Sequence, residues 1–231
     1  MEDFLLEKYS LDNKFLNALE CLNLLSIDEK ILLENHKIVL EYNANEIIIK
    51  KGVLANNVML LTEGLVKLEI MNDNRLSTVD LINSNSFIGL LSSLAFKRYD
   101  FMVTAIENSK VSFFDLDVFI GIIKNNGTFS FALMQHISVV TNQLLHKITR
   151  LSKKNIEGAL SIVLLDFVTI YKSTLFTLPM KRKVLAEMLG YSKESIINTL
   201  SKFNKEGIIS IDKKRIEILD IEKLVIISKF G

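Results

Sequence analysis

Apolar residues recur at helical spacing over residues 184–200 and fit two short helices that meet at a tight turn. Two leucines lie one turn apart in the first helix, and Ala186 supplies a small residue where the helices cross. Gly190 can adopt the left-handed conformation that ends a helix, and the hydroxyl of Ser192 can cap the next helix. The spacing therefore predicts a helix-turn-helix.

Apolar and polar positions fall on opposite faces of the second predicted helix. The apolar face carries Ile196, Leu200 and Phe203. The other face carries Lys193, Glu194, Ile197, Asn198 and Ser201. Because this second face is not needed for packing, it is free to contact DNA. A helical hairpin without a DNA-binding role would show the same apolar spacing, so the pattern alone leaves that alternative open.

A basic hairpin follows the predicted recognition helix. After Gly207, residues 208–211 and 215–219 alternate like two short strands around a polar turn at 212–214. Residues 178–215 hold nine Lys and Arg against four acids, a net charge of +5, whereas the whole chain carries +1 and its remainder therefore −4. Because phosphate neutralisation supplies most non-specific DNA affinity, this segregation favours a DNA interface.

The pattern changes from helical to alternating at about Ile38. Six short runs are predicted as strands, separated by turn signals: residues 47–49, 58–61, 65–70, 77–82, 102–106 and 111–114. Strands of this length and spacing favour a sandwich or a rolled barrel. Upstream, residues 12–25 have helical spacing, and Ser26 with Glu29 fits a capping box that opens another helix.

The helical period returns after Asp115, and residues 131–151 form a long amphipathic segment. Its apolar stripe consists of Leu133, Ile137, Val140, Leu144, Ile148 and Leu151. Such a stripe fits a helix that pairs with its twin in a homodimer. A helix that only packs onto the barrel would show the same stripe.

Composition narrows the class of protein. With 231 residues and 49% hydrophobic content, the chain can bury two modest cores. The lone Cys21 cannot form an internal disulfide or hold an iron–sulfur cluster or a structural zinc by itself, and it is predicted to pack in the core. The chain has no basic leader and no segment long enough to span a bilayer, so we expect a cytoplasmic protein without a membrane partner. The sequence shows no catalytic constellation, and we expect no enzyme.

The order of these elements resembles bacterial transcription regulators of the Crp/Fnr type. The matching segments are Asn45-Glu46-Ile47-Ile48 and Lys51-Gly52 for a strand and turn, Glu63-Gly64-Leu65-Val66-Lys67 for a strand entry, and Phe87-Ile88-Gly89 for the start of the phosphate-binding cassette. The resemblance implies an α+β fold with an N-terminal β jelly roll and flanking helices, a long dimerisation helix and a C-terminal winged helix-turn-helix. It implies three parts: a cyclic-nucleotide-binding-like effector domain (1–128), a dimerisation helix and linker (129–152) and a DNA-binding domain (153–231).

The sequence departs from the cyclic-AMP-binding members of that family at its effector site. Those members use a glutamate for the ribose, an arginine–serine pair for the phosphate and polar residues for adenine. The aligned positions here are Leu90, then Tyr99 and Asp100, then Leu144 and Leu145. A leucine cannot hydrogen-bond a ribose and an acid repels a phosphate, although Lys97 and Arg98 would restore a cation after a small register shift. The sequence therefore argues against cyclic AMP as the effector.

The residues leave the identity of the effector open. A retained pocket would be lined by Phe87, Gly89, Leu90, Leu91, Tyr99, Leu144 and Leu145. This lining suits an apolar or mixed small molecule, whereas a collapsed pocket and a constitutive regulator fit the same residues. One cysteine excludes an Fnr-type iron–sulfur cluster. Haem stays an alternative through His36, His136 or His146, although lone histidines are usually surface or packing residues.

The resemblance also assigns DNA contacts. The recognition helix begins at Ser192 with Ser195 in its first turn. Base contacts are expected from Lys193, Glu194, Ile197 and Asn198, and phosphate contacts from Lys181, Arg182, Lys202, Lys213, Lys214 and Arg215. Many relatives have arginine where this chain has Asn198, which puts the usual family half-site in doubt. The expected partners are double-stranded DNA in a palindromic operator, a second copy of the chain, a small-molecule effector and, as a further candidate, RNA polymerase.

Overall fold

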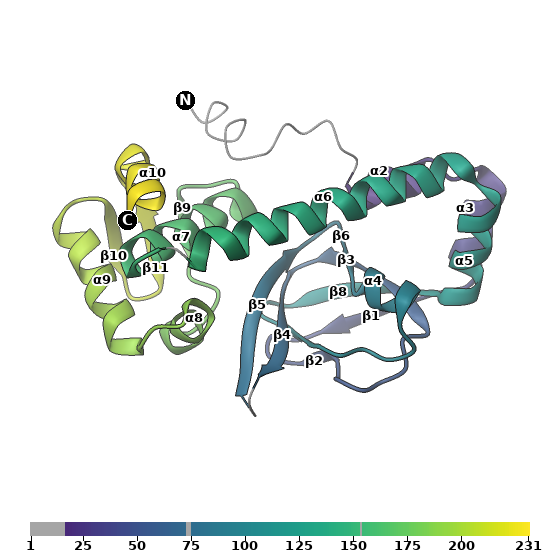
Figure 1. Cartoon of the computed structure of the whole chain (residues 1–231), viewed down its shortest axis with the longest axis horizontal. Coiled ribbons are helices and arrows are strands. Elements are labelled where there is room, and N and C mark those ends of the chain that lie inside the picture. Colours follow the sequence, from purple (N-terminus) through teal and green to yellow (C-terminus); the bar gives the residue numbers. More distant parts are fainter. Residues whose placement is uncertain (1–16, 73–74, 153) are drawn as a thin grey trace. The chain divides into compact units, whose positions relative to one another are not determined.

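The computed structural model describes residues 17–72, 75–152 and 154–231 (Figure 1). The chain divides into two compact units, Met1–Gln143 and Leu144–Gly231, and each is described by itself. The division falls inside the long helix, upstream of the limit at residue 152 that the sequence predicts.

The first unit is built from two four-stranded antiparallel sheets with strand orders β1-β8-β3-β6 and β2-β7-β4-β5. Their bounds are β1 Lys37–Tyr42, β2 Ile47–Ile49, β3 Asn57–Glu63, β4 Leu65–Asn72, β5 Arg75–Asn83, β6 Ser86–Ile88, β7 Met102–Ala105 and β8 Ser109–Asp115. All six strands that alternation predicts are present. The short β6 and the exposed edge strand β1 were not among them.

Strand β3 explains why a central strand has a continuous apolar run. Met59 and Leu61 belong to a core between the two sheets, which also receives side chains from β2, β4, β7 and β8. Val58 and Leu60, which alternate with them, belong to a second core between the first sheet and the helices. Because successive strand residues point to opposite faces, a strand buried on both sides needs apolar residues at every position.

Among the described residues, five helices cover the second core or extend from it (Figure 1). They are α2 Ala18–Asn23, α3 Ile27–Asn35, α4 Leu90–Ala95, α5 Leu116–Asn125 and α6 Gly127–Ser152. The predicted capping box of α3 is confirmed, since Ser26 Oγ accepts from the Glu29 backbone N–H and the Glu29 carboxylate accepts from the Ser26 N–H. Cys21 is fully buried, as predicted, and burial raises the pKa of its thiol. Residues 12–16 of the predicted first helix lie outside the described residues.

Helix α6 confirms the long amphipathic segment and divides its apolar residues between two surroundings. Two residues of the predicted stripe, Leu133 and Ile137, pack against the second core, so the stripe as predicted is not a continuous face for a second helix. This supports the packing role that the stripe also allowed. Other large apolar side chains of this helix are exposed: Phe131, Met134, Val140, Leu145 and Ile148. Within the described residues, the helix therefore has more apolar surface than the rest of the chain covers.

The second unit combines helices with a three-stranded antiparallel sheet of order β10-β11-β9. Its elements are α7 Ile156–Tyr171, β9 Leu175–Thr177, α8 Arg182–Leu189, α9 Lys193–Lys205, β10 Ile209–Asp212, β11 Arg215–Ile218 and α10 Ile221–Phe230. Eight residues of α7 are buried, which makes it the central helix of this unit. The sequence predicted α8, α9 and the hairpin, whereas α7, β9 and α10 were not predicted individually.

Ser161 of α7 is the basis of a stability prediction. Its hydroxyl is fully buried and has no hydrogen-bond partner among the described residues, so the cost of its desolvation is not offset. We expect Ser161→Ala to raise the free energy of unfolding by about 1 kcal/mol, helped by the better helix propensity of alanine. Ser228→Ala is the matched control, because that buried hydroxyl donates to Val225 O at 2.8 Å. Urea denaturation would measure both, and a loss of stability in Ser161→Ala would contradict the prediction.

Candidate functional site

Helices α8 and α9 form the predicted helix-turn-helix. Gly190 ends α8 at φ 73° and ψ 23°, and its N–H donates to the carbonyls of the last turn. Ser192 caps α9, since its Oγ accepts from the Ser195 N–H at 3.0 Å. Leu185 and Ala186 are buried on the inner face of α8. Each residue that the spacing assigned to the turn therefore has its expected local role.

Helix α9 separates its residues into two faces as predicted. Ile196, Leu200 and Phe203 are buried and anchor the helix to the unit. On the opposite face the exposed residues are Lys193, Glu194, Ile197, Asn198 and Ser201. These side chains are not engaged in the core, so they can meet base edges if the helix enters a major groove.

The basic hairpin is present and is fastened to the helix-turn-helix. Asp212 pairs with Arg215 across a two-residue turn in which Lys213 has a left-handed φ of 54°. Arg182, at the start of α8, donates from Nη2 to the Lys213 carbonyl at 3.0 Å, and the Leu178 N–H donates to Lys214 O at 2.7 Å. These bonds hold the tip of the wing beside the first residues of α8.

The residues predicted to contact phosphate differ in whether their charged groups are exposed or already bonded to another residue. Four of them have exposed side chains at the wing or before α8: Lys181, Lys213, Lys214 and Arg215. Arg182 is half-buried and already donates to the wing. Lys202 Nζ lies 2.5 Å from Glu157 Oε1 of α7, and this hydrogen bond raises the pKa of Lys202. The Glu157 carboxylate therefore competes with phosphate for the Lys202 ammonium.

The residues predicted to line an effector pocket are distributed over different parts of the fold. Leu90 is 6% exposed and belongs to the core between sheet and helices, where the Phe87 ring also packs against Phe119 and His136. Tyr99 is 4% exposed and belongs to the core between the two sheets. Leu91 is exposed on α4. Leu144 and Leu145 lie on the part of α6 that groups with the second unit.

Aromatic rings fill the space beside Gly89. A Cβ atom at Gly89 would lie 2.9 Å from the Phe101 ring and 3.2 Å from the Tyr99 ring. The Tyr99 hydroxyl donates to Asn57 O at 3.0 Å, which fixes the ring in place. Nearby, Arg98 is occupied by the Gly52 carbonyl, which accepts from Nη1 at 2.7 Å. Tyr99 and Arg98, which the sequence places at or beside the aligned phosphate-binding pair, thus both donate to backbone carbonyls of their own unit.

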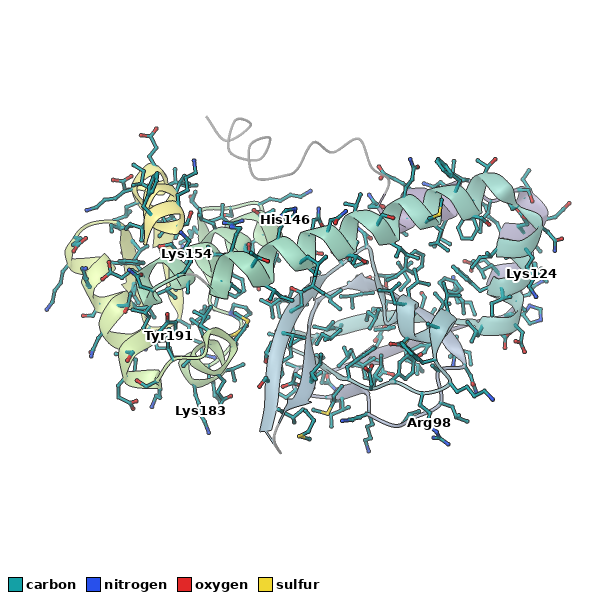
Figure 2. All side chains as sticks on the ribbon, viewed as in Figure 1. Arg98, Lys124, His146, Lys154, Lys183 and Tyr191 are labelled. Carbon is teal, nitrogen blue, oxygen red and sulfur yellow. The ribbon has the colours of Figure 1, made fainter. Side chains whose placement is uncertain are left out.

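The three histidines lie in separate surroundings. His36 ends α3 with Nδ1 at 2.9 Å from Leu32 O, His136 packs against Phe87, and His146 is exposed on α6 (Figure 2). Within the described residues, no three His, Cys, Asp or Glu side chains gather closely enough to hold a metal ion. Among the described helices, none is both long and apolar enough to cross a membrane.

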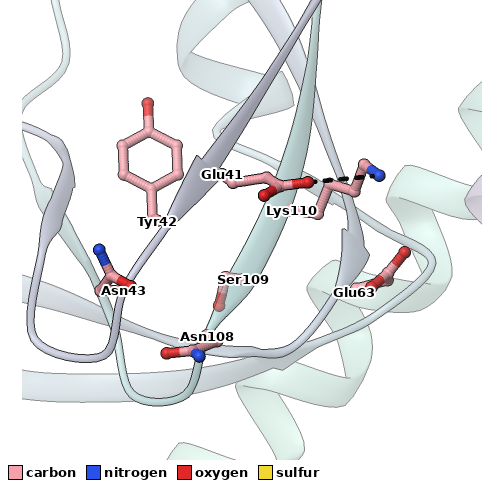
Figure 3. Close-up of a pocket in the computed structure, with 7 residues that line it drawn as sticks. All are labelled: Glu41, Tyr42, Asn43, Glu63, Asn108, Ser109 and Lys110. Atoms are coloured by element: carbon pink, nitrogen blue, oxygen red, sulfur yellow. Dashed lines mark ion pairs between the residues drawn. The ribbon is translucent and has the colours of Figure 1, made fainter.

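A polar cavity of about 310 Å³ lies at the ends of β1 and β3 and the start of β8 (Figure 3). It is lined by Glu41, Tyr42, Asn43, Glu63, Asn108, Ser109 and Lys110. Lys110 Nζ lies 3.6 Å from Glu41 Oε1, so one acid and one base in the lining neutralise each other. None of the predicted effector residues lines this cavity.

Two family models match the chain. A model described as a cyclic nucleotide-binding domain matches residues 39–126, and one described as a Crp-like helix-turn-helix domain matches residues 159–226. Their order and limits agree with the double-sheet unit and with the helix-turn-helix described above. The chain belongs to the Crp/Fnr family of transcription regulators.

The chain is also similar to a curated relative and, in its fold, to solved structures. The HTH-type transcriptional regulator ycf28 of Porphyra purpurea is 25% identical over 194 residues, covering 82% of this chain and 77% of the relative. FixK2 of Bradyrhizobium japonicum has a TM-score of 0.73 at 16% identity, with 83% of this chain and 96% of that chain covered. TTHB099, a CRP-family transcriptional regulator of Thermus thermophilus, has a TM-score of 0.72 at 18% identity, with 83% and 97% covered.

The structure adds contacts to the Crp/Fnr fold that sequence reasoning missed. Glu157 approaches Lys202, and the Tyr191 hydroxyl donates to Lys154 O at 3.0 Å. These partners are separated by 45 and 37 residues, so no local spacing could have paired them. The sequence contains only a weak indication of these two contacts. Tyr191 is a polar aromatic residue in the turn, and Glu157 is an acid in the first turn of an apolar helix.

Proposed function

We propose that this Crp/Fnr-family protein acts as a homodimer whose two α9 helices enter successive major grooves of a palindromic operator, about one helical turn apart. The observation that carries this proposal is the exposed polar face of α9, which is backed by three buried apolar residues and flanked by a basic wing. A helix so anchored presents its outer side chains in fixed positions, which sequence recognition requires.

The outer face of α9 offers chemistry for all four bases. Lys193 can donate to guanine, Glu194 can accept from cytosine N4, Asn198 can pair with adenine, and Ile197 can touch a thymine methyl group. Ser192 and Ser195 lie at the helix N-terminus, where backbone N–H groups and hydroxyls suit a phosphate. We assign Lys181, Lys213, Lys214 and Arg215 to phosphate contacts, and Arg182 and Lys202 first to holding the wing and α9 in place.

The exposed face of α6 supports dimerisation through residues 129–152. The exposed apolar residues of this face are Phe131, Met134, Leu145 and Ile148. Ser138 and Thr141 lie between Met134 and Leu145, so that the six positions follow one another at alternating steps of three and four residues. A second copy of the same helix would cover this face. We therefore keep the domains proposed from the sequence: effector domain 1–128, dimerisation helix and linker 129–152, and DNA-binding domain 153–231.

We propose an effector other than cyclic AMP, bound at the N-terminal domain and acting on the pose of the DNA-binding domains. A constitutive regulator with a vestigial sensor domain is the second candidate. It is favoured by the burial of Leu90 and Tyr99, which occupy the cores as ordinary packing residues. RNA polymerase remains a candidate partner of either form.

Operator selection on random duplex DNA with the purified protein tests the proposal. The spectrum and mass of the protein as isolated are recorded alongside. A palindrome with half-sites one turn apart supports the dimeric regulator, and a co-purified ligand names the effector class. A melting temperature that rises with added ligand separates a sensor from a constitutive regulator. Recovery of no preferred sequence, with and without cell metabolites, would contradict the proposal.

Asn198→Ala is expected to lower affinity for the selected operator roughly ten- to a hundredfold, because one bidentate base contact is lost. The change should be confined to one base position of each half-site and should leave the salt dependence of binding unaltered. Ser201→Ala is the control within the helix, because Ser201 lies on the same exposed face but is assigned no base in this proposal. Lys181→Ala should instead weaken binding to every sequence and reduce the salt slope by about 1. Fluorescence anisotropy with operator and random duplexes measures each, and equal losses on both duplexes for Asn198→Ala would contradict its assignment.

A further inference from the structure

The segment between α6 and α7 is joined to the helix-turn-helix at its turn (Figure 2). Tyr191 lies in the turn, directly before Ser192, which caps the recognition helix. Its half-buried hydroxyl donates to the backbone carbonyl of Lys154 at 3.0 Å. Lys154 in turn directly precedes Asn155, the N-cap of α7. One hydrogen bond therefore links the start of the recognition helix to the chain that leaves α6.

The acceptor of this bond is held in place from several sides. The Lys154 ammonium donates to the carbonyl of Lys229 near the end of α10, and its backbone N–H donates to Leu151 O at 3.2 Å. Asn155 Oδ1 accepts from two backbone N–H groups of the first turn of α7, each at 3.0 Å. Because its surroundings are fixed, the Lys154 carbonyl is a defined anchor for the Tyr191 hydroxyl.

A second link reaches the other end of the recognition helix. Glu157, three residues after Lys154, lies 2.5 Å from Lys202 in the last turns of α9. The short segment 154–157 thus contacts the chain at two places: at Tyr191, directly before the cap of α9, and at Lys202, near the end of α9. Two separated contacts fix both the position and the direction of a helix axis, which one contact could not do.

The end of α6 is also attached to this unit. Lys147 Nζ lies 3.0 Å from Asp166 Oδ2 of α7. The last turns of α6, the segment 154–157 and α9 are therefore joined by side-chain contacts within the second unit. In a dimer that pairs through α6, these contacts determine where each recognition helix lies relative to the dimer axis.

We propose that Tyr191 is a positioning residue for DNA recognition: by bonding the Lys154 carbonyl, its hydroxyl sets the pose of α9 relative to the end of α6, and so the spacing between the two recognition helices. The proposal rests on the dimeric DNA-binding function proposed above. Tyr191 makes no base contact in this scheme. Its effect should therefore appear in operator geometry, because half-site spacing mirrors the geometry of the dimer.

The test compares the full-length wild type with Tyr191→Phe, which removes the hydroxyl and keeps the ring. Tyr42→Phe makes the same chemical change in the other unit and serves as the control. The probes are the selected operator, the same operator with one base pair added to or removed from its centre, and a random duplex of equal length.

We expect Tyr191→Phe to weaken operator binding roughly two- to tenfold, the change that loss of one neutral hydrogen bond produces. The penalty for altered half-site spacing should shrink, since the recognition helices are held less firmly. Random-duplex affinity and the salt slope should stay at wild-type values, because phosphate contacts are retained. Tyr42→Phe should match the wild type on every duplex.

Two results of the binding experiment would overturn the proposal. One is an unchanged spacing preference in Tyr191→Phe; the other is an equal loss on operator and random duplex together with a lower melting temperature, which indicates a structural role only. Amide hydrogen exchange without DNA gives an independent measure: residues 154–158 and 192–196 should exchange faster in Tyr191→Phe, and unchanged exchange would also overturn the proposal. A wild type that prefers no operator refutes the proposed function instead, before any variant is compared.

Discussion

Phe203→Ala is expected to lower the free energy of unfolding of the DNA-binding unit by about 3–5 kcal/mol and to abolish operator binding at ordinary temperatures. The Phe203 ring is fully buried beside the other two anchors of α9, so its removal leaves a cavity under the recognition helix. The loss approaches the whole stability of a small domain. Urea denaturation followed by far-UV circular dichroism measures it, and operator binding is measured on the same preparation.

Ile197→Ala is the matched control for this effect. Ile197 lies on the same helix but is 37% exposed on the outer face, so truncation leaves no internal cavity. We expect stability close to wild type and a loss of operator affinity limited to one base position. If both variants lost stability equally, the division of α9 into an anchoring face and a DNA-contacting face would be wrong.

The two faces of α9 could be predicted because they depend only on local spacing. A helix repeats every 3.6 residues, so Ile196, Leu200 and Phe203 had to share one side, and the structure buries all three. The cap at Ser192 and the turn at Gly190 are equally local. The same holds for the capping box of α3, whose two partners are three residues apart.

Elements whose signal is not periodic were harder to predict. Helix α7 is buried on most of its surface, and its residues are apolar almost throughout, so it shows little contrast between faces. Strand β1 is an edge strand with exposed aliphatic residues, including Ile38 and Leu40, and lacks the alternation of a half-buried strand. Strand β9 has three residues and is stabilised by pairing with β11, which no short sequence window contains.

In the effector region, the residue that replaces a family residue predicts the loss of a ligand contact but not the packing around it. Leu90 in place of a glutamate predicted the loss of a ribose partner, and its burial in the core agrees with a packing role. The sequence could not predict that the rings of Tyr99 and Phe101 would lie against Gly89, because the residues meet only when β6 and β7 are placed in the fold. Long-range contacts such as Tyr191 with Lys154 have the same origin.

Gly64→Ala is expected to destabilise the double-sheet unit by about 3–5 kcal/mol, the sum of backbone strain and overpacking. Gly64 has φ 95°, a conformation that L side chains rarely adopt. A Cβ atom there would also lie 2.5 Å from the Asn108 carbonyl oxygen and 2.4 Å from Ser109 Oγ. Backbone atoms of a paired strand end cannot move aside cheaply, so the β3–β4 turn and the start of β8 must separate.

Gly52→Ala distinguishes the two causes. Gly52 has a similar φ of 87°, but a Cβ atom there would meet nothing within 4 Å, so only the backbone strain applies. We expect a loss of about 1–2 kcal/mol for Gly52→Ala, well below that of Gly64→Ala, in urea denaturation of the full-length protein. The difference between the variants measures how tightly β8 is packed against the turn. Equal losses would mean that the turn can yield without disturbing β8, and that backbone conformation alone accounts for the glycine at position 64.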